Sequence, residues 1–296
     1  MRIFVTGASG FIGSAVVAEL LQAGHQVLGL ARSEASAQAL AAAGAQVQRG
    51  DLNDLASVHR AVAESDAVIH TAFNHDFSRF LASCEEDRQV IAAMGAMLAG
   101  TGRPLIVTSA IAVAQAAPGL PATEDDRPKS CTVLPRAASE EAALAVAAGS
   151  GNVSVVRLSQ VHDRRKQGLI SDLVKLGRDK GVSAFVGDGQ YRWPAAQVGD
   201  VARLYRLALE KRQPGSVYHA VAEEGVTLRQ IAEVIAHRLG LPAVAIPHEE
   251  TAAHFGWLAK FATLDMPASG ARTQALLGWL PQGPGLIGDL QQLSID

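Results

Sequence analysis

The feature that most constrains this chain is a regular alternation of short apolar runs with longer helical segments over residues 1–160. Helical periodicity and many alanines and leucines mark the intervening segments. We expect strands at 2–7, 26–32, 45–52, 66–72, 104–110 and 153–158. Strands joined by helices pair in parallel, because a parallel pair needs a crossover connection. The alternation therefore predicts an α/β fold with a doubly wound parallel sheet covered by helices on both faces.

After Leu158 the alternation gives way to loops rich in arginine, lysine, glycine and aspartate. We expect four further helices and one more strand, at 169–180, 198–211, 227–240, 268–279 and 216–222. The helix at 198–211 and the strand at 216–222 return to the sheet. We therefore assign residues 1–160 and 197–222 to a nucleotide-binding domain, and residues 161–196 and 223–296 to a smaller substrate lobe.

Charge and cysteine content narrow the classes of partner. With 26 Lys and Arg against 29 Asp and Glu, the net charge is −3, which does not favour nucleic acid or an anionic membrane. No apolar run approaches the roughly 18 residues of a transmembrane helix, and the chain opens directly on a strand, so we expect no leader. Two cysteines, Cys84 and Cys131, are too few for a disulfide framework. We expect a cytoplasmic protein with a small-molecule substrate.

The stretch TGASGFIG lies at the turn between the first strand and the first helix. Gly7 permits the tight turn, Gly10 lets the backbone approach a pyrophosphate, and Gly13 lets the helix pack on the strand. The helix N-terminus adds free N–H groups and partial positive charge. An ordinary glycine-rich turn is the alternative, but the strand-turn-helix context favours a dinucleotide site. The expected contacts are Gly7, Ser9, Gly10, Phe11, Ile12 and Gly13.

The end of the second strand predicts which dinucleotide binds. Arg32 and Ser33 stand where an NAD-preferring protein would offer a carboxylate to the adenosine ribose. An arginine binds a 2′-phosphate through charge-assisted hydrogen bonds, whereas a carboxylate would repel it. The pattern favours NADP(H) over NAD(H), with a solvated charge at a strand end as the alternative.

Two more stretches follow strands at the expected ligand edge of the sheet. Asp51 and Leu52 follow the third strand and are placed for the adenine. Thr71, Ala72 and Phe73 follow the fourth strand, at its carboxyl end. We expect all five to contact the cofactor, although Phe73 is also compatible with plain core packing.

Taken in order, the motifs resemble the extended and atypical short-chain dehydrogenase/reductases. The matching pieces are TGASGFIGSAVV, LARS, GDL, VIHTAF, LIVTSAIAV, VVRLSQV, VGDVARLY and LLGWLP. The resemblance implies an NAD(P)-binding Rossmann domain, a C-terminal substrate lobe and often a homodimer formed through two helices of each subunit. Small residues in MGAMLAG and AALAVAAG would suit such close helix packing.

The resemblance also implies a serine with a YxxxK pair. The tyrosine transfers the proton, the lysine lowers its pKa, and the serine polarises the substrate oxygen. Ser109 matches the serine, but Arg136 and Glu140 stand at the tyrosine and lysine positions. Arginine stays charged and is a poor acid, yet it can bind an oxyanion. Glu140 could also pair with Arg136 one helical turn away, which would make both residues structural.

Other residues could replace the missing acid. His162 follows the sixth strand in VHDRRKQG, four residues before Lys166, and histidine exchanges protons near neutral pH. Tyr191 could supply a phenol from the opposite side, and His75 could approach the nicotinamide end. A solvated loop and a packed aromatic are the alternatives. No HxxxH or CxxC spacing indicates a metal site.

Two functions follow from this pattern. The first is an NADPH-dependent oxidoreductase of a small carbonyl or alcohol, with catalytic roles for Ser109, Arg136, His162 and Tyr191. The second is a non-catalytic NADP-binding sensor or regulator, which the loss of tyrosine and lysine favours. A nucleotide-sugar epimerase is a weaker hypothesis, because that chemistry also uses the missing tyrosine.

Overall fold

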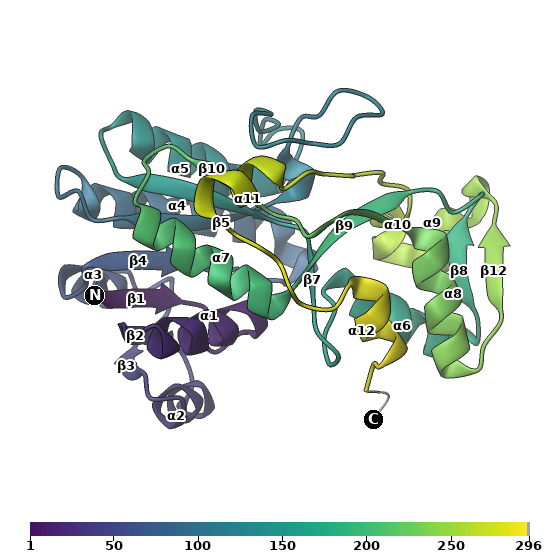
Figure 1. Cartoon of the computed structure of the whole chain (residues 1–296), viewed down its shortest axis with the longest axis horizontal. Coiled ribbons are helices and arrows are strands. Elements are labelled where there is room, and N and C mark those ends of the chain that lie inside the picture. The colour runs from purple at the N-terminus through teal and green to yellow at the C-terminus, as the bar shows by residue number, and fades with distance from the viewer. Residues whose placement is uncertain (295–296) are drawn as a thin grey trace.

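A seven-stranded parallel sheet forms the centre of the protein, for which a computed structural model describes residues 1–294 (Figure 1). The strands lie in the order β10-β6-β5-β4-β1-β2-β3, and every adjacent pair is parallel. Their bounds are Arg2–Thr6 (β1), Gln26–Ala31 (β2), Gln46–Arg49 (β3), Ala67–His70 (β4), Leu105–Ala110 (β5), Val153–Leu158 (β6) and Val217–Ala220 (β10). The predicted α/β fold with a doubly wound sheet is confirmed.

Helices cover both faces of this sheet, and alternate strand residues supply the two cores. Ile3 and Val5 of β1 pack on one face, whereas Phe4 packs on the other. The helices of the first face are α1 (Phe11–Gln22), α2 (Glu34–Ala42) and α7 (Val198–Lys211). Those of the second face are α3 (Leu55–Ala63), α4 (Phe80–Leu98) and α5 (Ala138–Ala148).

The small residues of α4 and α5 serve packing within the chain. A Cβ built on Gly95 of α4 would lie 2.3 Å from Cγ2 of Val146 on α5. The two helices are therefore close neighbours because Gly95 has no side chain. Whether their outer faces also join two subunits stays a prediction.

The second part of the structure lies beyond the carboxyl ends of the sheet (Figure 1). It contains a three-stranded sheet of β7 (Gln160–His162), β9 (Arg192–Gln197) and β11 (Glu223–Thr227), and a pair formed by β8 (Ser183–Val186) and β12 (Ala243–Ile246). Its helices are α6 (Leu169–Lys180), α8 (Leu228–Leu239), α9 (Thr251–Phe255), α10 (Ala259–Ala262) and α12 (Leu286–Gln291). The expected helices α6 and α8 are present, together with shorter elements that show no periodicity in the sequence.

One helix of the C-terminal stretch lies elsewhere. Helix α11 (Ala271–Leu277) contacts α7 and β10, and the following Trp279 is buried in the core on that face of the main sheet. This part of residues 223–296 therefore packs on the sheet rather than in the lobe. Among the described residues, no helix is both long and apolar enough to cross a membrane. Cys84 and Cys131 are free thiols.

Candidate active site

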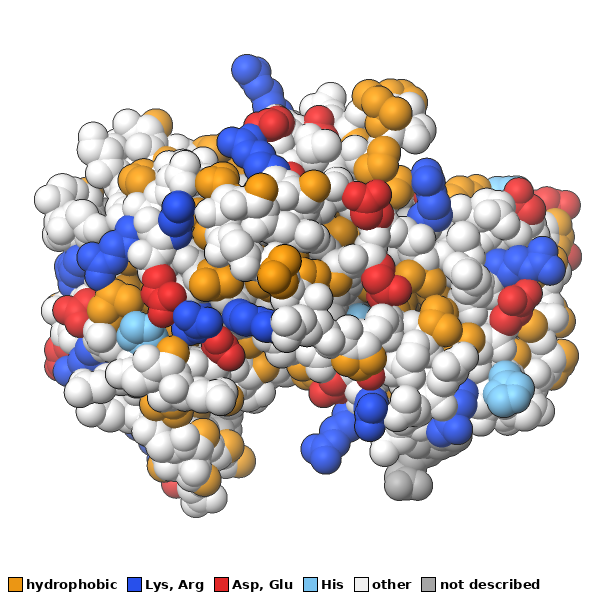
Figure 2. All heavy atoms as spheres, in the orientation of Figure 1, with side chains coloured by type: hydrophobic (Ala, Val, Ile, Leu, Met, Phe, Trp, Pro, Cys, Tyr) orange, Lys and Arg blue, Asp and Glu red, His pale blue; other side chains and the backbone are white. Residues whose placement is uncertain are grey.

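The switch in strand order places the candidate site. Strand β1 lies between β2 and β4, so the connections leaving its two sides diverge at the carboxyl edge of the sheet. Ligands of open α/β sheets bind in the crevice at such a point. In the space-filling view, the surface is indented between the part that holds α1 and α2 and the part that holds α6 and α12 (Figure 2). Lys and Arg side chains stand at the edge of this indentation.

The glycine loop is fixed by backbone contacts at this switch. Gly7 has φ +65°, and a Cβ there would lie 2.7 Å from the Ala72 nitrogen. A Cβ on Gly13 would lie 2.0 Å from the Gly7 oxygen. Gly10 precedes α1, and no side chain caps that helix, so its first N–H groups face outward beside exposed Ser9. The loop therefore offers bare backbone donors, which suit a pyrophosphate.

The end of β4 is tied to the same loop. Thr71 Oγ1 donates to the Thr6 oxygen over 2.7 Å, and the Ala72 nitrogen donates to Thr6 Oγ1 over 3.3 Å. Thr6 directly precedes Gly7. The structure thus brings Thr71 and Ala72 against the glycine loop, as their placement at the strand end predicts, and Phe73 follows them.

The adenosine end keeps its arginine open. The Arg32 side chain is 83% exposed, and its Nε lies 4.0 Å from Asp51 Oδ2. Ser33 caps α2 by accepting from the Ser36 nitrogen, and Leu52 packs partly against the core. Arg32 and Asp51 therefore lie together at the ends of β2 and β3, and both remain predictions as cofactor contacts.

Ser109 points into the protein. Its Oγ donates to Glu140 Oε2 over 2.9 Å, and both residues are buried. Glu140 also accepts from Arg157 Nη2 over 2.6 Å and from Arg157 Nε. Arg157 is the β6 residue paired with Ser109 of β5. At the position where the resemblance implies a lysine, the structure has the carboxylate of a buried ion pair.

This ion pair continues to a histidine. Arg157 Nη1 lies 3.2 Å from His219 Nε2, and the Ser269 oxygen lies 2.9 Å from His219 Nδ1. Burial is the main cause that lowers the pKa of His219, and the nearby charge of Arg157 also lowers it. Ser109, Glu140, Arg157 and His219 therefore form a buried hydrogen-bonded network behind the sheet edge, and a catalytic role for Ser109 stays a prediction.

Arg136 has a different set of partners. Its Nη2 donates to the Thr108 oxygen over 2.9 Å, and its Nη1 donates to Asp87 Oδ2 over 3.2 Å and to Ser139 Oγ. Its guanidinium carbon lies 4.3 Å from the centre of the Phe73 ring, a cation–π distance. The alternative that Glu140 pairs with Arg136 is wrong, because Arg157 draws that carboxylate to the other side.

Asp87 links Arg136 to the glycine strand. His70 Nε2 lies 2.8 Å from Asp87 Oδ1, and His70 Nδ1 lies 2.7 Å from Thr6 Oγ1. Burial alone would raise the pKa of Asp87. The electrostatic interaction and hydrogen bond with His70, together with the charge of Arg136 and the hydrogen bond of Ser139, instead hold this pKa below its usual value. A buried row of polar groups therefore runs from Thr6 to Arg136 and holds the guanidinium in place.

Two more basic groups lie near Arg136. Partial burial, followed by the charges of Arg136 and Lys166, lowers the pKa of His75. The ring of His75 packs edge-on against Phe73 at 5.2 Å. Lys166 reaches over the Phe11 ring, with Nζ 5.7 Å from its centre. No local sequence pattern links Arg136, His75 and Lys166, since they come from three separate segments.

His162 and Tyr191 are placed in the lobe. His162 ends β7, has no exposed surface, and holds Nδ1 2.8 Å from Asp289 Oδ2. Tyr191 is half-buried, with its ring 6.2 Å from that of His248. None of these described contacts involves Ser109 or Arg136. Catalytic roles for His162 and Tyr191 therefore stay predictions.

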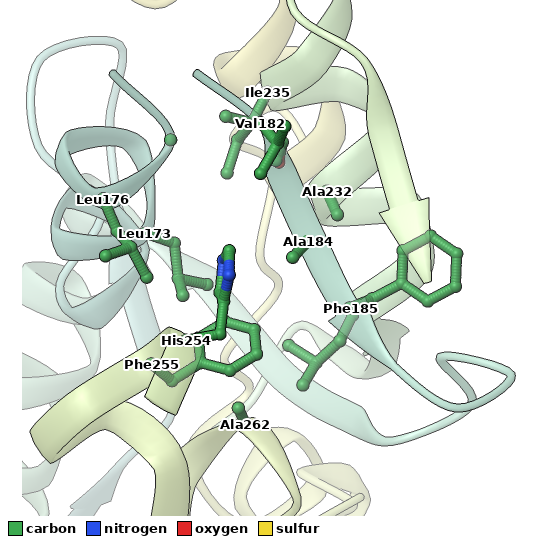
Figure 3. Close-up of a pocket in the computed structure, with 13 residues that line it drawn as sticks. Leu173, Leu176, Val182, Ala184, Phe185, Ala232, Ile235, His254, Phe255 and Ala262 are labelled. Carbon is green, nitrogen blue, oxygen red and sulfur yellow. The ribbon is translucent and has the colours of Figure 1, made fainter. Parts of the chain in front are cut away.

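The lobe has a cavity of its own, lined mainly by apolar side chains from α6, β8, α8 and α9 (Figure 3). Leu173, Ala184 and Phe255 are among these side chains, and the His254 ring projects between them. Its volume is about 20 Å³, which accommodates about one water molecule. This space is too small for a substrate, and it is lined by no residue of the sheet edge. The candidate site is therefore the sheet edge around Arg136.

Comparison with known proteins supplies the family. Residues 3–222 match the model of the NAD dependent epimerase/dehydratase family. The chain belongs to this family. Family membership and reductase-named relatives make it an NAD(P)-dependent enzyme of the oxidoreductase type, as the sequence indicates.

Several relatives span most of the chain. An uncharacterized protein of Schizosaccharomyces pombe is 45% identical over 291 residues, covering 98% of each chain. The 2-alkyl-3-oxoalkanoate reductase of Stenotrophomonas maltophilia is 30% identical over 264 residues, covering 82% of this chain and 77% of the reductase. The crystal structure of the dTDP-glucose 4,6-dehydratase DesIV from Streptomyces venezuelae superposes with a TM-score of 0.78 at 21% identity, covering 99% and 96%. That last likeness is one of fold.

Proposed function

We propose that this protein is an NADPH-dependent reductase of a small carbonyl compound, or a dehydrogenase of the matching alcohol, in which Arg136 binds the substrate oxygen. The observation that carries the proposal is the fixed guanidinium at the tyrosine position, held by Thr108 and Asp87 and lying against Phe73. A positioned cation of this kind stabilises negative charge that develops on an oxygen.

The residues of the sheet edge fit the cofactor. Gly7 and Gly13 leave a close-fitting turn, and the uncapped start of α1 would bind the pyrophosphate. The exposed Arg32 would bind a 2′-phosphate, which supports NADPH, and Lys166 adds a second cation beside Phe11. When bound, the reduced cofactor supplies a hydride.

The protein's own groups then divide the work. Arg136 remains a cation throughout, so it stabilises the charged oxygen but does not protonate it. His75 is largely neutral at pH 7, because its pKa lies below the ordinary value. We propose that water delivers the proton to the oxygen at neutral pH, and that Ser109 acts by holding Glu140 rather than by touching substrate.

Arg136→Gln tests the proposal. The glutamine keeps hydrogen-bonding capacity but removes the charge, so we expect kcat/KM for reduction of small aldehydes to fall by roughly 100-fold or more. The affinity for NADPH, measured by titration of protein fluorescence, should stay within about twofold, because Arg136 hydrogen-bonds to Thr108 of β5 and Asp87 of α4 rather than to the glycine loop. The assay follows oxidation of NADPH with a panel of small aldehydes and ketones.

Arg206→Gln is the matched control, since Arg206 of α7 is a partly buried arginine that forms ion pairs with Glu19 and Glu210. Turnover that survives in Arg136→Gln would remove Arg136 from the reaction. Tight NADPH binding without oxidation by any carbonyl would instead favour the sensor, which the inward orientation of Ser109 and Glu140 also supports.

A further inference from the structure

A row of rings leads away from Arg136. We define the aromatic strip as Phe73, His75, Phe77, Phe80, Trp257 and Phe261. Neighbouring ring centres lie 4.7 to 6.4 Å apart, within the range of attractive aromatic contacts. The strip therefore forms a continuous path of ring contacts.

The strip joins the two parts of the molecule. Phe77 lies in the short helical turn η1 (Phe77–Arg79) that follows β4, whereas Trp257 lies in η5 (Gly256–Leu258), between α9 and α10 of the lobe. Their rings stack at 4.7 Å with an interplanar angle of 26°. This contact bridges the sheet domain and the lobe beside the candidate site.

The two outer rings of the strip, Phe77 and Trp257, are partly exposed to solvent. Phe77 is 37% exposed and Trp257 is 48% exposed, and they are the two aromatic residues among the exposed large hydrophobic side chains of residues 1–294. Apolar surface left exposed in this way commonly marks a binding surface. Ring contacts connect the exposed rings to Phe73, and Phe73 lies against the Arg136 guanidinium. The exposed rings therefore extend the candidate site.

Charge varies along the strip in a way that defines a ligand. At the inner end, Arg136 offers a cation for an oxygen. Towards the outer end, Phe77 and Trp257 stack on each other and still leave ring surface exposed, and Oδ1 of the nearby Asp76 accepts hydrogen bonds from Ser78. A polar chain laid on the rings would lose water without gaining partners, which is unfavourable. A flat apolar group would lose nothing.

Resting on the proposed function, we propose that the substrate is a carbonyl compound bearing an aromatic group, and that Phe77 and Trp257 select it. The carbonyl oxygen lies towards Arg136 and the ring lies along the outer strip.

The test uses two aldehydes that share a CH2–CHO group and differ in the ring, phenylacetaldehyde and cyclohexylacetaldehyde. The methylene removes conjugation between ring and carbonyl, and comparing the ratio of the two substrates between the natural protein and its variants cancels the remaining difference in intrinsic reactivity. We expect the natural protein to reduce the phenyl compound with a kcat/KM roughly 3- to 10-fold higher, the size of one aromatic contact. In Trp257→Leu and Phe77→Leu the ratio should fall towards one, mainly through KM, whereas Leu144→Ala, an exposed apolar change on α5, should leave it unchanged. An unchanged ratio in both ring variants overturns the proposal.

Fluorescence separates this proposal from the proposed function. Trp193 and Trp279 have no exposed surface, so quenching by acrylamide reports Trp257. With NADP present, phenylacetamide should protect Trp257 from quenching, and cyclohexylacetamide should protect it less. Protection without any aldehyde reduction would sustain the strip and refute the reductase. Reduction without preference or differential protection would sustain the reductase and refute the strip. Near-ultraviolet circular dichroism checks that each variant is folded.

Discussion

At the cofactor end of the sheet edge the decisive contacts are made by backbone, whereas at the catalytic end they are made by charged side chains. Gly13 meets the Gly7 oxygen and Gly7 meets the Ala72 nitrogen, so only glycine fits. Around Arg136 and Glu140, carboxylates and guanidinium groups from distant strands and helices pair in the interior. We therefore expect added side-chain volume to be most damaging at the cofactor end, and removal of a charge to be most damaging at the catalytic end.

Removing one charge at the catalytic end should have the largest effect. Glu140→Gln leaves Arg157 buried without an anion, and breaking a buried pair costs about 3–5 kcal/mol of unfolding free energy. Urea unfolding followed by far-ultraviolet circular dichroism measures this loss.

The neighbouring residue provides the control. Glu141 pairs with Arg88 near the surface, so Glu141→Gln should cost at most about 1 kcal/mol. If both variants lost the same unfolding free energy, the buried Glu140 pair would contribute no more to stability than the surface Glu141 pair.

Adding one methyl group at the cofactor end should come next. In Gly13→Ala the new Cβ meets backbone, so we expect about 1–3 kcal/mol of destabilisation and weaker NADPH binding. Unfolding and fluorescence titration measure the two effects. Gly149→Ala is the control, because its Cβ would lie 3.5 Å from the nearest atom, an ordinary contact. If Gly13→Ala kept the natural stability and NADPH affinity, α1 would have to shift away from β1 to make room for the new methyl group.

Arg32→Ala should alter cofactor choice without altering the fold. The side chain is mostly exposed, so stability should change by less than about 0.5 kcal/mol. The ratio of kcat/KM for NADPH to that for NADH should fall by roughly 10- to 100-fold, since a hydrogen bond to a charged group contributes about 1.5–3 kcal/mol and about 1.4 kcal/mol corresponds to tenfold. A constant ratio would assign the 2′-phosphate to another residue.

The smallest effect concerns pH. The pKa of His75 lies below its ordinary value of 6.5, so the ring gains a proton only under acidic conditions. That proton adds positive charge beside Arg136 and supplies an acid, so kcat/KM should rise as pH falls through this lowered pKa. His75→Gln should give a flat profile there.

In the folded state His75 binds its proton more weakly than in the unfolded chain, so its contribution to stability is present above pH 6.5 and is lost on acidification.

The same contrast explains what the sequence could predict. The seven strands and the glycine loop follow from local patterns, and the structure contains them at the expected residues. The partners of Arg136 and Glu140 depend on strand order and register, which place Arg157 beside Ser109. One signal was available, since Arg157 is a charge inside the apolar run VSVVRL and a buried charge requires a partner. Four of the lobe strands were missed because they are only three to five residues long, too short to show a strand period.

The buried pair of Glu140 and Arg157 also constrains how this site can change over evolutionary time. Returning a lysine to position 140 in a single step would set two cations together in the interior, and removing Arg157 alone would leave an isolated carboxylate. Either single substitution passes through a protein of reduced stability. Only a simultaneous exchange of both positions avoids this loss of stability, which separates the site from the YxxxK arrangement that the resemblance implies.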